Sequence, residues 1–210
     1  MRTEIRLAGF GGQGIVLAGA ILGESAIIAD LEAVQTQSYG PESRGGAARS
    51  EVVIADGPVD YPRVTVPDVL IVLSSAAMRK YGEERGEKTR TVVDDDLVQM
   101  EVEGAERVPF TMTAENLGRR IVANIVMLGF ITNRFKLVPR EAIEKAILKR
   151  IPKGTEELNM NAFQAGWDLA DGKKPKQAKQ AKQAKKAKDT KKASDDKKGG
   201  KAKKGKGGKA

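Results

Sequence analysis

The sequence predicts an α/β fold, a Rossmann-like, largely parallel sheet flanked by helices, followed by a lysine-rich C-terminal tail. Runs of strand length alternate with longer helical segments along the first 172 residues, a pattern typical of parallel sheets covered by helices. A glycine-rich turn joins the first predicted strand to the first helix. From residue 173 the apolar content falls to scattered alanines, which leaves no face to bury. We therefore predict a folded domain over residues 1–172 and a disordered basic tail over 173–210.

The first half of the chain supplies four predicted strands around a buried helix. Strands are expected at Thr3–Ala8, Ala33–Gln37, Arg49–Ala55 and Val69–Leu73, and the helix at Ile15–Ala29. The helix is apolar on nearly all sides, so it is expected to be well buried, with Gly19 and Gly23 permitting close packing. The last strand is continuously apolar, as in strands covered on both faces. A second helix follows it, capped by Ser74 or Ser75.

The second half of the chain is mainly helical. Short strands are predicted at Thr91–Asp94 and Arg107–Phe110, and helices at roughly Ile121–Thr132, Pro139–Arg150 and Thr155–Asp171. A proline suits the first turn of the middle helix, where its missing N–H costs nothing. Before these elements, Asp56–Asp68 contains three prolines and is expected to form an irregular connection or an edge strand.

The net charge of +9 is unevenly distributed. Residues 173–210 contain 17 Lys and 3 Asp, a net charge of +14, which leaves residues 1–172 with a net charge of −5. The high isoelectric point is therefore no sign of a basic nucleic-acid-binding fold. We interpret the tail as a solubilising extension. Non-specific, salt-sensitive binding to a polyanion, such as nucleic acid, an anionic membrane surface or an acidic protein, is the alternative.

The chain contains neither cysteine nor histidine, which excludes several kinds of chemistry. Iron–sulfur ligation, most zinc sites, histidine acid–base catalysis and a cysteine nucleophile all need those residues. The N-terminus carries Arg2, Glu4 and Arg6 and has no long apolar run, unlike a signal peptide. The most apolar later run, Ile121–Ile131, is too short to span a bilayer and contains Asn124. We expect a cytoplasmic protein without a membrane span.

The glycine turn GFGGQG matches the dinucleotide fingerprint G-x-G-x-x-G and lies between a predicted strand and a helix. Such a turn brings the amides of a helix N-terminus to a phosphate, although any tight strand-to-helix turn also uses glycines. NAD binding further requires an acid at the end of the second strand. That strand ends VQTQSYG, and Asp30 and Glu32 come too early. The dinucleotide interpretation is therefore disfavoured.

A second loop, SYGPESRGG at Ser38–Gly46, takes the place of the missing acid. Its glycines expose backbone amides, Tyr39 offers a flat face and Arg44 a guanidinium, so it suits a phosphate-rich ligand rather than a ribose diol. A flexible loop with a solvated arginine is the alternative. The candidate binding residues of the two loops are Gly9, Gly11, Gly12, Gln13, Gly14, Tyr39, Ser43, Arg44, Gly45 and Gly46.

Four residues have more than one interpretation. Gln13 is expected to bond a ligand or partner subunit, or to cap the following helix. Asn124 lies amid apolar residues, so we favour a buried asparagine bonded to backbone over a ligand or interface contact. Phe163 and Trp167 are expected to pack in the core, with stacking on an adenine as the minority alternative.

The two loops together resemble the gamma subunit of 2-oxoacid:ferredoxin oxidoreductases, and most closely the 2-oxoglutarate type. The resemblance rests on RLAGFGGQG followed by QTQSYGPESRGGAARSEVVIADGPVDYP, and it continues through IVANIVMLGF and ELNMNAFQAGW to about residue 171. It implies that residues 1–172 are a pyruvate/ketoisovalerate oxidoreductase gamma-type domain with a Rossmann-like fold.

The resemblance also implies a function for the assembled enzyme. Such enzymes decarboxylate a 2-oxoacid, here 2-oxoglutarate, reduce ferredoxin and form an acyl-CoA, here succinyl-CoA. Thiamine diphosphate, Mg and the Fe-S clusters would lie on the partner subunits, which are alpha, beta and a ferredoxin-like delta. This chain would contribute coenzyme A (CoA) binding and assembly, with no catalytic residue and no metal ligand. CoA suits the two loops because its pyrophosphate and 3′-phosphate need amides and arginine but no ribose-binding acid.

Three alternatives stay open on the sequence alone. The chain could serve a relative that acts on indolepyruvate, a branched-chain oxoacid or pyruvate. It could be a free NAD(P)- or FAD-binding Rossmann protein. It could also be a basic-tailed scaffold or nucleic-acid binder, for which the folded domain is incidental.

Overall fold

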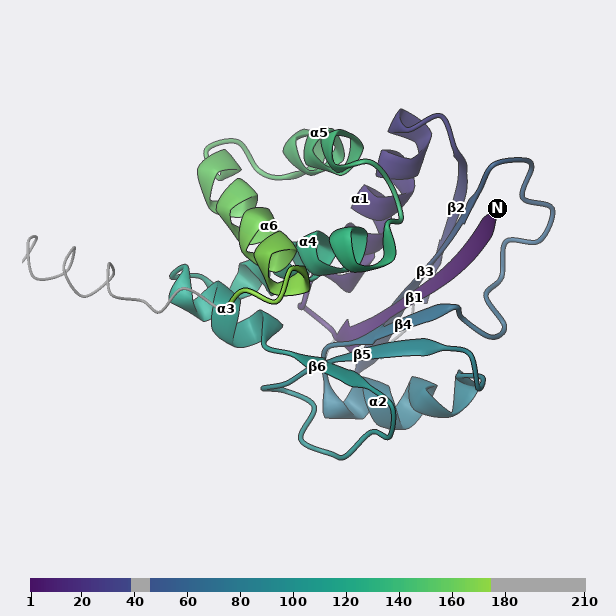
Figure 1. Cartoon of the computed structure of the whole chain (residues 1–210), viewed down its shortest axis with the longest axis horizontal. Coiled ribbons are helices and arrows are strands. Elements are labelled where there is room, and N and C mark those ends of the chain that lie inside the picture. The colour runs from purple at the N-terminus through teal and green to yellow at the C-terminus, as the bar shows by residue number, and fades with distance from the viewer. Residues whose placement is uncertain (39–45, 175–210) are drawn as a thin grey trace, which may run out of the picture. The chain divides into compact units, whose positions relative to one another are not determined.

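The computed structural model describes residues 1–38 and 46–174 (Figure 1). Within those residues, six strands form one mixed sheet in the order β2-β3-β1-β4-β5-β6. They are β1 (Arg2–Phe10), β2 (Glu32–Gln37), β3 (Ala47–Ala55), β4 (Val69–Val72), β5 (Arg90–Asp94) and β6 (Glu106–Val108). The predicted α/β fold is confirmed, because helices connect and cover these strands on both sides. The predicted boundary near residue 172 stays a prediction, since the tail from residue 175 lies outside the described residues.

One strand of the sheet runs against its neighbours. β1, β4, β5 and β6 pair in parallel, whereas β3 is antiparallel to both β1 and β2. β3 lies between them and pairs with β1 over its full length, from Arg2 opposite Ala55 to Phe10 opposite Ala47. The end of β1 therefore lies beside the start of β3.

The sheet has two unlike faces, which we call the helical face and the α2 face. The helical face carries α1 (Ile15–Ile28), α3 (Phe110–Asn116), α4 (Ala123–Phe135), α5 (Arg140–Arg150) and α6 (Glu156–Ala170) (Figure 1). The other face carries α2 (Ser75–Tyr81). Strand side chains alternate between them, so Ile5 and Leu7 join the core beneath α1 and α4, whereas Ala8 packs in the core of α2.

Helices α4 and α6 pack closely against each other on the helical face. A Cβ on Gly129 would collide with the backbone of Phe163, and one on Gly166 with that of Val126. Phe163 is fully buried and its ring lies 5.8 Å from that of Trp167. The prediction that these two aromatic residues pack in the core is confirmed.

The structure corrects the prediction at Arg107–Phe110. The strand there is β6, which ends at Val108, and Phe110 begins helix α3. The helix start is fixed by a distant group, since the Asp94 carboxylate accepts bonds from the Thr111 N–H at 3.0 Å and the Thr111 hydroxyl at 2.7 Å. Burial raises the pKa of Asp94, and these bonds oppose that shift. A cap supplied from another strand leaves no trace in the local pattern.

Three smaller predictions are settled by local geometry. Ser74 caps α2, with its hydroxyl accepting from the Ala77 N–H at 3.2 Å. Gly19 of α1 does permit close packing, since a Cβ there would collide with Ser50. The segment 56–68 forms no helix or strand. No helix in the described part of the chain is long and apolar enough to cross a membrane.

Candidate functional site

The glycine loop turns the chain from β1 into α1 with open amides at the helix start. Gly12 and Gly14 have φ angles of 95° and 71°, in the region that favours glycine. Gly14 is the N-cap of α1, and no side chain from residues 1–38 or 46–174 caps the helix. The amides of Gly11 and Gln13 are bonded within the site, to the carbonyls of Gly46 and Phe10. The first amides of α1 therefore remain available as donors at the positive end of the helix dipole.

Gln13 braces this loop rather than capping the helix. Its Oε1 accepts from the Phe10 N–H, and its Nε2 donates to the Leu73 carbonyl, just after β4, at 2.9 Å. A Cβ on Gly9 would lie 2.7 Å from Gln13 Oε1, so this position needs a residue without a side chain. The capping interpretation is wrong, because Gly14 occupies the N-cap. Gly9 and Gln13 together set the shape of the loop.

The two predicted loops meet where the structure describes both. The Gly11 N–H donates to the Gly46 carbonyl at 3.0 Å, a contact that follows from the pairing of β1 with β3. The remaining residues predicted from the second loop, Tyr39, Ser43, Arg44 and Gly45, lie outside the described residues. Their part in the site stays a prediction.

Asn124 fixes the glycine loop from the opposite side. It lies in the first turn of α4, is 4% exposed, and donates from Nδ2 to the Gly14 carbonyl at 3.2 Å. This confirms the interpretation of Asn124 as a buried asparagine bonded to backbone. Since a Cβ on Gly14 would collide with the Asn124 amide, the two residues depend on each other.

A cavity of about 470 Å³ opens beside the glycine loop. Its walls are the loop itself, the start of α4 and the segment leading into α6. Leu17, Ile121, Ile125, Ile151 and Leu158 make one side apolar. Arg119 is the one charged residue among the described residues of the lining, and its guanidinium has no ion pair or hydrogen bond with another described residue. Neither this cavity nor the place of Arg119 in it could be predicted from the sequence, because the walls of the cavity come from segments far apart in the chain.

The N-termini of α1, α4 and α6 reach the cavity, and the first turns of α1 and α6 differ in charge. The first turn of α6 contains Glu156 and Glu157, and the Glu156 carboxylate accepts from the Gly154 N–H at 3.0 Å. Hydrogen bonds from its own amide and from that of Gly154 lower the pKa of Glu156. The first turn of α1 contains no acid. An anion in the cavity is therefore favoured at the start of α1 and disfavoured at the start of α6.

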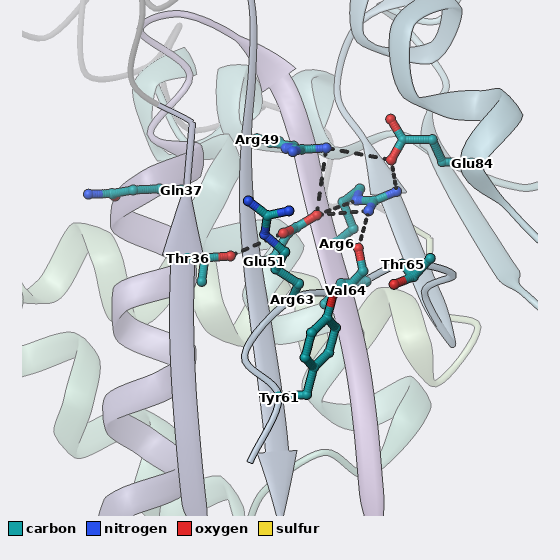
Figure 2. A pocket seen from close by; sticks show the side chains of 10 residues that line it. All are labelled: Arg6, Thr36, Gln37, Arg49, Glu51, Tyr61, Arg63, Val64, Thr65 and Glu84. Atoms are coloured by element: carbon teal, nitrogen blue, oxygen red, sulfur yellow. Dashed lines mark hydrogen bonds and ion pairs between the residues drawn. The ribbon is translucent and has the colours of Figure 1, made fainter. Parts of the chain in front are cut away.

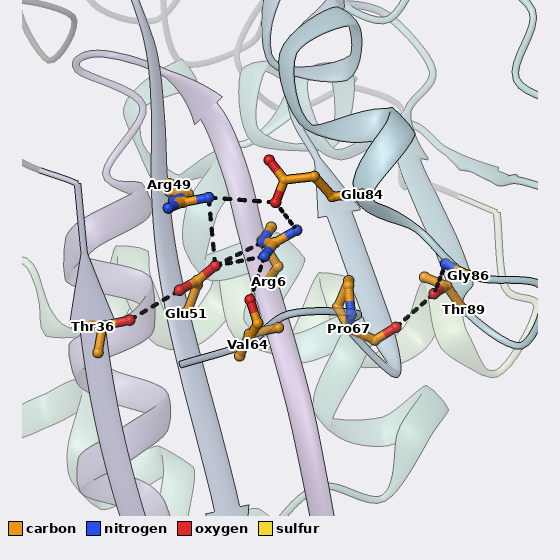
Figure 3. Close-up of polar contacts among 9 residues, drawn as sticks. All are labelled: Arg6, Thr36, Arg49, Glu51, Val64, Pro67, Glu84, Gly86 and Thr89. Carbon is orange, nitrogen blue, oxygen red and sulfur yellow. Dashed lines mark hydrogen bonds and ion pairs between the residues drawn. The ribbon is translucent and has the colours of Figure 1, made fainter. Parts of the chain in front are cut away.

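A second cavity, of about 770 Å³, lies on the α2 face and is lined by charged side chains (Figure 2). Arg6 is 1% exposed at its centre. Its Nε lies 2.8 Å from Glu51 Oε1, its Nη2 donates to the Val64 carbonyl at 2.7 Å, and its Nη1 pairs with Glu84 at 2.6 Å (Figure 3). Arg49 lies 3.8 Å from Glu51 and 3.5 Å from Glu84. This network also went unpredicted, because β1 pairs Arg6 with a residue 45 positions away.

Metal chemistry finds no support in the side chains of this chain. The sequence has no cysteine or histidine, and among the described residues no group of three or more Asp and Glu could hold a metal ion. The donors at the glycine loop are backbone amides and one guanidinium, which suit an anion.

Comparison with known proteins identifies the family. The family model described as "Pyruvate ferredoxin/flavodoxin oxidoreductase" matches residues 4–169. The chain belongs to this family. The 2-oxoglutarate synthase subunit KorC of Methanocaldococcus jannaschii is 54% identical over 177 residues, which cover 81% of this chain and 95% of the relative. The resemblance to 2-oxoacid:ferredoxin oxidoreductases of the 2-oxoglutarate type is confirmed, and the protein is a subunit of an oxidoreductase.

Solved structures agree with the described fold. The gamma subunit of a keto/oxoacid ferredoxin oxidoreductase from Geobacter sulfurreducens is 46% identical, with a TM-score of 0.74 and coverage of 82% of this chain and 98% of that one. The 2-oxoglutarate:ferredoxin oxidoreductase from Magnetococcus marinus, solved with 2-oxoglutarate, CoA and succinyl-CoA bound, shares the fold at 22% identity and a TM-score of 0.74. The chain covers 32% of that longer protein, and 84% of the chain is matched. The protein is thus a gamma subunit of a 2-oxoacid:ferredoxin oxidoreductase.

Proposed function

We propose that this gamma subunit binds CoA for an enzyme that converts 2-oxoglutarate and CoA to succinyl-CoA and CO₂ with reduction of ferredoxin. The relative named 2-oxoglutarate synthase, at 54% identity, supports the choice of substrate. The Magnetococcus marinus enzyme of the same fold, whose structure holds CoA and succinyl-CoA, supports the choice of CoA. Subunits for indolepyruvate, branched-chain oxoacids or pyruvate are the alternatives within the family.

The cavity beside the glycine loop suits two chemically different parts of the CoA molecule. The amides at the start of α1 and the Arg119 guanidinium suit phosphate groups, whereas the apolar wall suits an extended pantetheine chain. The one observation that carries the proposal is this combination of open helix amides, an unpaired guanidinium and an apolar wall in a single cavity. The second loop, with Tyr39, Ser43 and Arg44, would add donors from the β2–β3 side.

The division of labour follows from what the chain lacks. Without cysteine it cannot hold Fe-S clusters, so we assign these, with thiamine diphosphate and Mg, to partner subunits of the alpha, beta and ferredoxin-like delta kinds. The task of this chain is then to bind and orient CoA and to support assembly. We place the enzyme in the cytoplasm, and assign the tail at most a non-specific affinity for polyanions.

Arg119→Ala in the assembled enzyme tests the CoA site. Loss of one charge-assisted bond to phosphate costs about 1.5–3 kcal/mol, so the KM for CoA should rise at least about tenfold. CoA-independent decarboxylation of 2-oxoglutarate, followed with an artificial electron acceptor, should stay unchanged. Arg44→Ala should behave in the same way.

Arg120→Ala is the matched control. Arg120 is the next residue, is exposed, and lies 3.8 Å from Glu115, outside the cavity lining. It should leave both activities as they are. An unchanged KM for CoA in Arg119→Ala, or equal loss of both activities, would contradict the proposal and assign this region to assembly.

A further inference from the structure

We propose that the charged cavity on the α2 face is a docking site for an acidic side chain of a partner subunit, with Arg63 as the residue that pairs with it. The inference rests on the proposed function in one respect, since it requires the chain to assemble with other subunits. It concerns a different face of the sheet from the CoA cavity, and different residues.

The four charges at the floor of this cavity balance one another. Arg6 contacts Glu51 and Glu84, and Arg49 lies near the same two carboxylates while its guanidinium lies 5.4 Å from the centre of the Tyr81 ring. The floor therefore carries no net charge. The positive charge of the buried Arg6 is already compensated by the carboxylates of Glu51 and Glu84, so Arg6 is not the group that would attract a further anion.

Arg63 is the surplus cation of the cavity. Its guanidinium extends from the irregular segment toward β2 and β3 (Figure 2). It is exposed and has no ion pair or hydrogen bond with any other described residue. A single unpaired guanidinium above a neutral floor fits one carboxylate, which it can bind through two N–H groups.

The segment that carries Arg63 is held in place although it is irregular. Its backbone carbonyls accept bonds at three points. The Tyr61 carbonyl accepts from Arg2 at 2.8 Å. Figure 3 shows the other two, from Arg6 to Val64 at 2.7 Å and from Thr89 to Pro67 at 2.6 Å. A surface fixed in advance loses little conformational entropy on binding. This anchoring distinguishes the segment from an ordinary solvated connection.

The surroundings of Arg63 favour a protein partner over a free metabolite. Tyr61 is 57% exposed and Val66 is 53% exposed on the same segment. Tyrosine and arginine are enriched where protein interfaces bind most strongly, and apolar neighbours exclude water around them. Small-molecule pockets are instead mostly apolar, whereas most of the residues that line this cavity are charged or polar.

Arg63→Glu tests the inference in the full-length chain co-expressed with its partner subunits. Charge reversal places two carboxylates together, so the dissociation constant of this subunit from the complex should rise at least about tenfold. Arg63→Lys keeps the charge without the planar fork and should give an intermediate value. Arg79→Glu, at an exposed position of α2 outside the cavity, is the control and should assemble as the wild type does.

Two further measurements separate the outcomes. Thermal unfolding of the isolated Arg63→Glu chain should match the wild type, because Arg63 has no partner among the described residues. Titration with inorganic phosphate, followed through the arginine Nε–H signals, should not give a saturable shift at Arg63. Normal assembly of Arg63→Glu overturns the inference, and a saturable phosphate shift together with normal assembly makes the cavity a small-anion site. If the wild-type chain assembles with no partner, both the proposed function and this inference fail.

Discussion

The two faces of the sheet build their sites from different parts of the chain. On the helical face, the glycine loop offers backbone amides, and Gln13 and Asn124 hold that loop from both sides. On the α2 face, the cavity is made from side-chain charges around a buried arginine. The backbone amides of the glycine loop are held in position by packing and by the side chains that bond the loop. The charged side chains of the α2 face are instead held by ion pairs with one another. The stability of the helical face should therefore depend mainly on side-chain volume, and that of the α2 face on side-chain charge.

Arg6→Ala should give the largest effect, because it breaks the charge balance of the α2 face. It leaves Glu51, which is 5% exposed, without its buried partner, and such losses cost about 3–5 kcal/mol in the free energy of unfolding. Chemical denaturation measures this value. Arg2→Ala, on the same strand but in an exposed pair with Glu4, should cost under about 1 kcal/mol. If the two variants lost similar amounts of unfolding free energy, the proposed difference between the buried and the exposed ion pair would be wrong.

Gly129→Ala tests the helical face by adding one methyl group. The new Cβ would overlap the Phe163 carbonyl, so α4 and α6 must separate, at a cost of about 1–3 kcal/mol in unfolding free energy. Gly23→Ala is the control, since the nearest atom to its Cβ would be Gln35 Cβ at 4.0 Å. There the higher helix propensity of alanine should stabilise the protein by up to about 1 kcal/mol. The two substitutions should thus shift the denaturation midpoint in opposite directions.

Glu24→Gln should give the smallest effect, and one that depends on pH. Glu24 of α1 pairs with Lys149 and Arg150 of α5, and its hydrogen bond with Lys149 is the main cause that lowers its pKa from 4.5, against a smaller effect of burial. A lowered folded-state pKa contributes stability above pH 4.5 that is lost as the pH falls through the folded value. The variant should therefore cost under about 1 kcal/mol at neutral pH and nothing well below pH 4.5. A cost that persists in acid would indicate lost packing instead.

Sequence patterns were sufficient where burial alone decides the structure. All four residues of β4 are buried, and so are eight of the fourteen residues of α1, although Val16 and Ile27 are exposed. Both elements were predicted within one or two residues. The helix α3 was missed because its start depends on the Asp94 carboxylate of another strand, and Phe110, two residues after Val108, reads locally as strand. The direction of β3 was also not predicted, because strand periodicity is the same in both directions.

The candidate site also has one part that the sequence could predict and another that it could not. The glycine loop could be predicted from its spacing, and its contact with Gly46 confirms that the two loops meet. Arg119 and Arg63 could not be predicted, because an arginine is informative only when its lack of a partner is known. Arg6 stood out only as a charge near the N-terminus, whereas its function depends on Glu51 across the strand pair.

The reversed strand β3 also bears on how this fold could evolve. In dinucleotide-binding folds, the strand next to the glycine loop ends there and carries the acid that binds ribose. Here β3 begins at that place, with Ala47 opposite Phe10, and the end of β2 is one strand further away. No single substitution can therefore place an acidic residue at the end of the strand beside the glycine loop, where it would bind the ribose. A change of cofactor would need the hairpin itself to be rebuilt, so the topology protects the ligand preference of this subunit against point mutation.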